Sequence, residues 1–210
     1  MRKLKFTLNR KSLNQIYLSY ILPILEYSAV VWDGCSVECS DSLQKIQNEA
    51  ARIVTGLTRS VSVTNLFREC GWKPLHVRRE TQKLCFMYRV AHNMTPSYIN
   101  DLIPPMVGEN NNYQLRNQAN FRIPYCRTTN SQKSCIPSSL NLWNNLDMST
   151  RNSDSLSSFK RALNRSSQHE RVPQHYLLGS RRLSVLHACL RNNCSDLKCD
   201  LFKVEPHGER

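Results

Sequence analysis

The chain has 210 residues, of which 40% are hydrophobic, and its 29 Lys and Arg against 16 Asp and Glu give a formal net charge of +13. This composition excludes a chain that is disordered throughout, and the length allows one sizeable core or two small ones. The basic excess favours an anionic partner, nucleic acid before a membrane, although a solvated basic surface without a partner is the plain alternative.

Nine cysteines and the lack of a secretory signal predict free thiols inside the cell, in the nucleus or the cytoplasm. The longest apolar stretch, residues 16–32, is interrupted by Pro23, Glu26 and Ser28. A membrane-spanning helix needs about 20 mostly apolar residues, so this stretch predicts a buried helix. We therefore expect no membrane partner.

The first helix is predicted from Ser12, which forms a capping box with Gln15. Apolar residues then recur at helical spacing, at Leu13, Ile16, Tyr17, Tyr20, Ile21 and Ile24. Pro23 lacks the N–H donor for its own turn, so we expect a kink or a break there.

A second helix is predicted from Asp41, which forms a capping box with Gln44, to a terminator at Gly56. Its apolar face comprises Leu43, Ile46, Ala50, Ile53 and Leu57. Lys45 and Arg52 fall on the opposite side, and we expect them to share a solvent-exposed stripe.

Two more helices are predicted in the first hundred residues. One runs from Ser62 to Cys70 and ends at Gly71, and the next begins at Pro74 and runs to Asn93. The helix from Pro74 carries several cations at helical spacing, and Trp72 and Lys73 come just before it in the sequence. Lys and Arg neutralise phosphates, and an aromatic ring can stack on a base or a sugar.

The candidate nucleic-acid-binding residues are therefore Lys45, Arg52, Trp72, Lys73, His76, Arg78, Arg79 and Lys83. Two structural alternatives stand beside this interpretation. Trp72 fills the core under the preceding turn, and the cations are simply solvated.

The composition changes at Pro104 and Pro105, and residues 104–150 predict an irregular connector or a small hairpin near Phe121, Ile123 and Tyr125. Helical spacing resumes at Leu156, Phe159, Ala162 and Leu163, and again after Ser180, with Leu183, Leu186 and Leu190 on one face. The predicted fold class is mainly α, with a helical bundle over 1–103, the connector over 104–150 and short C-terminal helices over 151–210.

No catalytic motif is recognisable: the sequence has no Gly-x-Ser-x-Gly elbow, no phosphate-cradling glycine loop and no paired carboxylates. The closest approach to a metal site has no Cys-x-x-Cys and fits no standard zinc spacing; it consists of His187, Cys189, Cys194, Cys199 and His207. Cys35 and Cys39 lack further ligands. We expect no catalytic residue, no metal, no cofactor and no small-molecule substrate.

Seven segments follow one another in an order that resembles one protein family. They are YLSYILPILEYSAVVWD from Tyr17, LQKIQNEAARIVTG from Leu43, ECGWKPLHVRRETQKLCFMYRV from Glu69, TPSYINDLIPP from Thr95, IPSSLNLWNNL from Ile136, RNSDSLSSFKRAL from Arg151 and GSRRLSVLHACLRNNCSDLKCDLF from Gly179. Their succession is similar to the region downstream of the polymerase palm in reverse transcriptases of non-LTR retrotransposons of the jockey-like type.

The resemblance implies a thumb-like helical bundle that grips a template and primer duplex. In that family, polymerisation depends on a palm motif with two adjacent aspartates that hold two metal ions, and no Asp-Asp pair occurs here. We therefore expect a fragment of an RNA-directed DNA polymerase that is not itself an enzyme and that binds RNA or DNA without sequence preference. The alternatives are a helical protein-interaction module and a transposon remnant without function.

Overall fold

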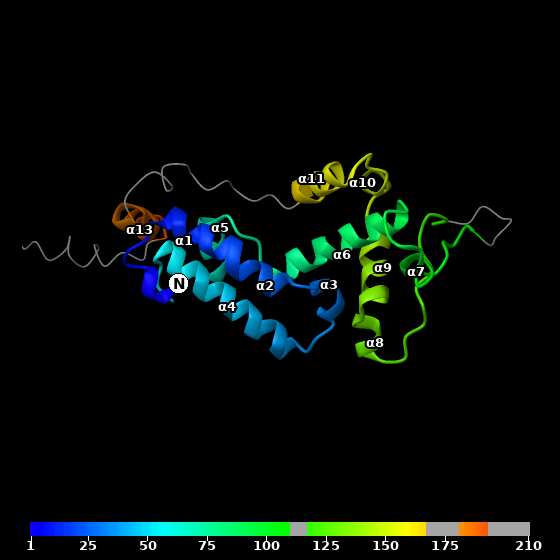
Figure 1. Cartoon of the computed structure of the whole chain (residues 1–210), viewed down its shortest axis with the longest axis horizontal. Helices are drawn as coiled ribbons and strands as arrows, with labels where there is room; N and C mark the ends of the chain where they lie inside the picture. The colour runs from blue at the N-terminus through cyan, green and yellow to red at the C-terminus, as the bar shows by residue number, and fades with distance from the viewer. Residues whose placement is uncertain (110–116, 167–180, 193–210) are drawn as a thin grey trace, which may run out of the picture. The chain divides into compact units, whose positions relative to one another are not determined.

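The computed structural model describes residues 1–109, 117–166 and 181–192, and these residues are mainly helical (Figure 1). The predicted mainly α fold class is confirmed. The helices are η1 (Arg2–Leu4), α1 (Arg10–Ile16), η2 (Tyr17–Ile21), α2 (Leu22–Glu26), α3 (Ala29–Trp32), α4 (Val37–Thr55), α5 (Val63–Cys70), α6 (Leu75–Ala91), α7 (Ser97–Asn100), α8 (Thr129–Lys133), α9 (Cys135–Asn144), α10 (Met148–Arg151), α11 (Leu156–Ser166) and α13 (Arg181–Arg191).

Two compact units are built from interleaved stretches of the chain. Unit 1 comprises Met1–Ile24, Gln44–Lys73 and His169–Arg210, of which residues 181–192 are described. Unit 2 comprises Leu25–Leu43 and Pro74–Gln168. The boundaries predicted at residues 103 and 150 cut the chain into consecutive regions, whereas each unit draws on separate stretches.

The first helix begins a turn earlier than predicted, because Asn9 caps it. The side chain of Asn9 accepts a hydrogen bond from the backbone N–H of Ser12 at 2.8 Å. The chain stays helical through Pro23 to Glu26. Tyr17–Ile21, which end two residues before the proline, form a π-helical segment. A π-type turn shifts the hydrogen-bond pattern that proline disrupts, so the proline changes the helix type without ending the helix.

The buried face of α4 differs from the predicted one. Its buried residues are Gln47, Ala50, Ala51, Val54 and Thr55. Ile46, which the pattern assigned to this face, is 48% exposed, so that assignment was wrong. The helix packs through two alanines, which permit close approach, and through Gln47, whose amide donates to the backbone carbonyl of Lys73 at 3.0 Å. A search for apolar residues at helical spacing overlooks Gln47, because Gln47 is polar and is buried with its amide hydrogen-bonded.

Gly56 ends α4 as predicted, with a positive φ of 77°. A Cβ at this position would lie 2.5 Å from Cγ2 of Val185 on α13, within unit 1. Two physical effects therefore favour glycine here: the left-handed backbone conformation, and the close approach of another helix.

Replacing Gly56 with alanine should lower the free energy of unfolding by about 2 kcal/mol, because backbone strain and overpacking add. Urea denaturation followed by circular dichroism measures this. Val185→Ala on its own removes the clashing methyl groups, so the double variant G56A/V185A should recover part of the loss. A double-mutant cycle with no coupling energy would show that the contact between Gly56 and Val185 is absent in solution.

Helices α5 and α6 confirm the predictions for this part of the chain. Ser62 caps α5 by accepting a hydrogen bond from the backbone N–H of Asn65 at 3.3 Å, and Gly71 ends it with a φ of 67°. Pro74 is the N-cap of α6. These boundaries were predictable because the capping residues act locally.

The core of unit 2 gathers on α6, α9 and α11. It contains Leu84, Cys85, Met87, Tyr88, Phe121, Leu140, Trp143 and Phe159. The ring of Phe159 stacks on Tyr88 at 4.7 Å and contacts Trp143 at 5.9 Å. The predicted irregular connector thus contains the core helix α9, and that prediction was wrong for residues 135–144. The expected hairpin is reduced to an isolated antiparallel bridge between Met106 and Phe121.

Arg151 is a buried cation that holds the irregular part of unit 2 together. Its side chain donates to the backbone carbonyls of Leu146 (3.0 Å), Asn144 (2.7 Å) and Ala119 (3.3 Å), and to the side chain of Asn120 (2.8 Å). Only 6% of Arg151 is exposed. One guanidinium therefore supplies hydrogen-bond donors to carbonyls at the end of α9 and in the loop before α9. No regular secondary structure pairs these carbonyls.

Helix α13 packs on unit 1 through its small residues. Ser184 and Ala188 are buried, whereas Leu183, Leu186 and Leu190 are 53%, 41% and 52% exposed. The prediction of a helix after Ser180 holds, but the three leucines do not form its buried face. Arg181 donates to the carbonyls of Ile53 (2.6 Å) and Val54 (3.4 Å), so it caps the C-terminal end of α4.

Candidate nucleic-acid interface

Four cations and one carboxylate gather on the surface of unit 1 around helix α4. Glu49 lies 3.3 Å from a guanidinium nitrogen of Arg2 and 3.6 Å from those of Arg52 and Arg59. Lys45 is exposed one turn earlier on the same helix. We call these five residues the Glu49 cluster. Its four cations and one carboxylate leave three positive charges in excess. Arg2, Lys45 and Arg59 are exposed, whereas the side chains of Glu49 and Arg52 are 35% and 20% exposed.

Of the four cations in this cluster, the sequence predicted two and missed two. Lys45 and Arg52 were expected on one stripe of α4; Lys45 is exposed, and the side chain of Arg52 is 20% exposed beside Glu49. Arg2 and Arg59 lie at other places in the sequence, so helical spacing on α4 gave no signal for them. Their side chains are 77% and 83% exposed. The fold of unit 1 brings them to α4.

Trp72 belongs to the core of unit 1 and not to its surface. It is 6% exposed, its ring stacks on Tyr17 with centroids 3.8 Å apart, and its indole N–H donates to the side chain of Asn14 at 2.8 Å. The alternative in which Trp72 fills the core is therefore the correct one. Lys73 is half-buried, and its backbone carbonyl accepts the hydrogen bond from Gln47.

The second group of predicted cations lies in unit 2, and two of its members are buried. Arg79 and Lys83 are each 4% exposed. Both bind the carboxylate of Asp33, at the end of α3, with 2.6 Å between Lys83 Nζ and the carboxylate. The guanidinium of Arg79 also donates to the hydroxyl of Ser40 at 2.8 Å, and Lys83 donates to that of Ser138 at 2.9 Å.

The prediction that the cations of α6 lie on the surface is therefore wrong for Arg79 and Lys83. Arg79 and Lys83 continue the buried line of Leu75 at four-residue intervals, a spacing that keeps them on one face of the helix. Arg78 is half-buried and binds Glu26, with 3.0 Å between Nη2 and Oε2. Of this group only His76 is exposed. Arg78, Arg79 and Lys83 pair with carboxylates inside unit 2, which leaves little of their charge for an external phosphate.

Asp33 is the centre of this buried charge group. Burial alone raises the pKa of its carboxyl group, but hydrogen bonds and positive charge, from Lys83 first and then from Arg79, outweigh burial and hold the pKa below its usual value. The guanidinium of Arg79 also lies 5.6 Å from the ring centre of Trp32. No local pattern connects Asp33 with α6, because Arg79 and Lys83 lie 46 and 50 positions further along the chain.

Metal ligation finds no support among the described residues, which contain no group of three His, Cys, Asp or Glu side chains able to hold an ion. Of the rejected zinc candidates, His187 and Cys189 lie on α13, and Cys194, Cys199 and His207 lie outside the described residues. Cys35 and Cys39 are free thiols.

Comparison with known proteins found no matching family model, no matching curated protein and no matching solved structure. None of the described helices is long and apolar enough to cross a bilayer.

Proposed function

We propose that this chain is a segment from downstream of the palm in a non-LTR retrotransposon reverse transcriptase, and that it binds RNA or DNA without sequence preference through the Glu49 cluster. The proposal gives it no polymerase activity, because the catalytic carboxylates of that family belong to the palm. It places the protein inside the cell, in the nucleus or the cytoplasm.

The observation that carries the binding proposal is the convergence of three guanidiniums on the single carboxylate of Glu49. Guanidinium groups bind phosphate oxygens in the same paired geometry with which they bind carboxylates. The Arg2 and Arg59 pairs with Glu49 are solvent-exposed and therefore weak, so a phosphate can replace the carboxylate at little cost. The net charge of +13 adds long-range attraction.

The proposal predicts a steep dependence of affinity on salt. Four phosphate contacts imply a slope of log affinity against log salt of about −3 for single strands, so affinity should fall roughly 50-fold between 50 and 200 mM salt. Fluorescence anisotropy with a labelled 20-nucleotide RNA, repeated at several salt concentrations, measures the slope. Affinity that is unchanged over this range would rule out the proposed mode of binding.

Arginine variants locate the binding surface. Arg59→Ala should reduce the magnitude of the salt slope by about 0.7, the share of one phosphate contact on a single strand. Arg127→Ala is the matched control, because Arg127 is also exposed but lies in unit 2, outside the Glu49 cluster. If the two variants lose the same affinity, binding is diffuse over the whole basic surface and the cluster is not the site.

A protein-interaction module is the second candidate, and exposed apolar side chains favour it. In unit 1, Tyr20 and Ile24 are 71% and 76% exposed at a four-residue spacing, which puts them on the same side of a helix. Light scattering during size-exclusion chromatography separates the two candidates. Concentration-dependent association that Ile24→Asp abolishes, in a chain that binds no RNA, would favour the interaction module.

A further inference from the structure

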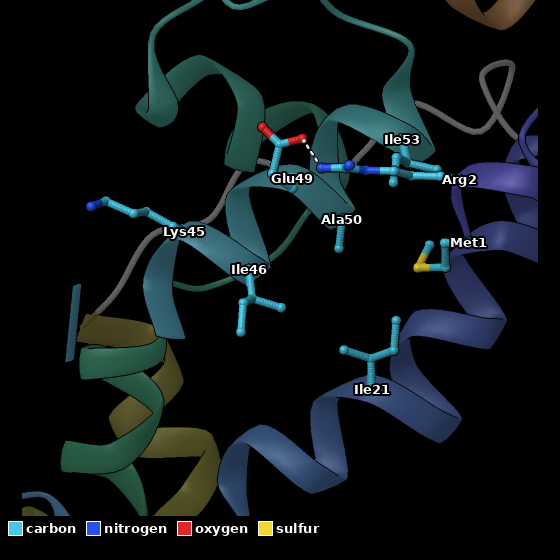
Figure 2. Close-up of a pocket in the computed structure, with 8 residues that line it drawn as sticks. All are labelled: Met1, Arg2, Ile21, Lys45, Ile46, Glu49, Ala50 and Ile53. Carbon is cyan, nitrogen blue, oxygen red and sulfur yellow. Dashed lines mark hydrogen bonds and ion pairs between the residues drawn. The ribbon is translucent and has the colours of Figure 1, made fainter. Parts of the chain in front are cut away.

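A pocket of about 370 Å³ opens beside the Glu49 cluster, within unit 1. Its wall is aliphatic, and Figure 2 shows side chains from the N-terminal segment, from η2 and from α4 around one space. The wall consists of Met1, Ile21, Ile46, Ala50 and Ile53. This volume is at the lower end of the range for small-molecule sites, enough for one narrow chain.

The rim of the pocket is charged on one side. Arg2, Lys45 and Glu49 complete the lining. In Figure 2 the Arg2 side chain reaches to Glu49 along the edge of the pocket, whereas Lys45 is directed away from its centre. Arg2 is therefore the cation that a ligand in the pocket meets first, and the other guanidiniums of the Glu49 cluster add to the positive potential there.

We propose that this pocket binds a single-chain anionic amphiphile, with its aliphatic chain against Ile21, Ile46 and Ile53 and its carboxylate on Arg2. The wall offers methyl and methylene groups to the chain, and such surfaces gain from burial in proportion to apolar area. A long unbranched chain fits this wall better than a nucleobase does. A base binds by stacking on an aromatic ring, and no aromatic residue lines the pocket.

The charge at the rim selects the sign of the head group. Arg2 is 77% exposed at its side chain and its bond to Glu49 is 3.3 Å long, so the pair is weak and easily exchanged. A carboxylate on the ligand takes the place of Glu49 as the partner of Arg2. The neighbouring Arg52 and Arg59 remain to neutralise Glu49. The proposal does not depend on nucleic-acid binding, because it needs only the aliphatic wall and Arg2.

Calorimetric titration of the full chain with decanoate below its micelle concentration tests the proposal. Saturable binding of one decanoate is expected, with decyltrimethylammonium about fivefold weaker, because one exposed ion pair contributes a factor of this order. Acetate at the same concentration should give no heat. Equal affinity for the anionic and cationic amphiphiles, or no saturation with decanoate, would overturn the proposal.

Two variants place the ligand in this pocket. Ile46→Asp puts a negative charge on the wall and should weaken decanoate binding at least about tenfold, because it repels the anion and replaces apolar surface. Ile123→Asp is the matched control: Ile123 is 45% exposed, close to the 48% of Ile46, and the change in net charge is the same. Circular dichroism checks that both variants fold. Equal decanoate affinity in the two variants would contradict the assignment.

The head group is tested separately from the chain. Arg2→Ala should weaken decanoate binding about fivefold and leave decanol binding unchanged, since decanol has the chain without the charge. Phosphatidylglycerol vesicles distinguish a free amphiphile from a membrane surface. If the vesicles bind while decanoate does not, the charge near α4 serves a membrane surface and the pocket proposal fails.

Discussion

Replacing Arg151 with alanine should lower the free energy of unfolding of unit 2 by about 4 kcal/mol, because the variant leaves buried acceptors of a charged donor unsatisfied. Four acceptors depend on this guanidinium: three backbone carbonyls and the side chain of Asn120. Urea denaturation followed by circular dichroism gives the free energy. Amide hydrogen exchange over residues 135–151 should show the loss of protection where the acceptors lie.

Two further variants serve as controls for Arg151→Ala. Arg165→Ala removes an exposed arginine from α11 of the same unit and should change stability by less than about 0.5 kcal/mol. Arg151→Lys keeps the charge but cannot reach several acceptors at once, so most of the loss should remain. If Arg151→Ala resembles Arg165→Ala, the guanidinium does not organise the loops of unit 2.

Replacing Asp33 with asparagine should lower the free energy of unfolding by about 3–5 kcal/mol, since it leaves two buried cations without a counter-charge. Arg79 and Lys83 are each 4% exposed, so water cannot easily take over the role of the carboxylate. Urea denaturation measures the loss. Asp154→Asn is the matched control, because Asp154 is exposed in the same unit.

The pH dependence of stability should identify Asp33 independently. Its pKa is lower in the folded chain than its usual value. Its stabilising contribution is therefore complete above the unfolded pKa of about 3.9 and is lost as the pH falls through the lower folded pKa. The difference in stability between the wild type and Asp33→Asn should be constant above about pH 5 and shrink below about pH 4. A difference that stays constant down to pH 2 would mean that another group balances the two cations.

Replacement of the whole charge group separates its electrostatic role from its packing. A triple variant with Asp33→Asn, Arg79→Met and Lys83→Met should recover much of the stability lost in Asp33→Asn, because it removes the uncompensated charges along with the carboxylate. If the triple variant is less stable than the single one, the long side chains of Arg79 and Lys83 stabilise unit 2 chiefly by packing.

Helices with local signals were predictable from the sequence, and helices that depend on distant partners were not. Ser62 and Gly71 enclose α5, and their capping roles follow from their own side chain and backbone. Helix α9 carries no charged residue and lies in a stretch rich in Asn and Ser, so its composition indicated a loop. It is held by the burial of Leu140 and Trp143 in the core of unit 2. Such tertiary packing overrides weak local propensity.

In the candidate interface, too, features with a local sequence signal were predictable and features that depend on distant residues were not. The spacing of Lys45 and Arg52 on α4 was visible in the sequence, and the ion pair of Arg52 with Glu49 joins neighbouring turns of the same helix. Arg79 and Lys83 have the same helical spacing, yet they are buried, because Asp33 supplies a carboxylate from another helix. Periodicity alone cannot tell a charged surface stripe from a buried one when the counter-charge is distant in the sequence.

The contact of Arg181 with α4 sets the order in which the chain can complete its fold during synthesis. The guanidinium reaches carbonyls 127 and 128 positions earlier, and closing a loop of this length costs about 4 kcal/mol in chain entropy apart from a constant term. All residues of unit 2 precede residue 169, so they are synthesised before α13. The hydrogen bonds from Arg181 to the carbonyls of Ile53 and Val54 can form only after α13 has left the ribosome, so they are among the last contacts that unit 1 gains.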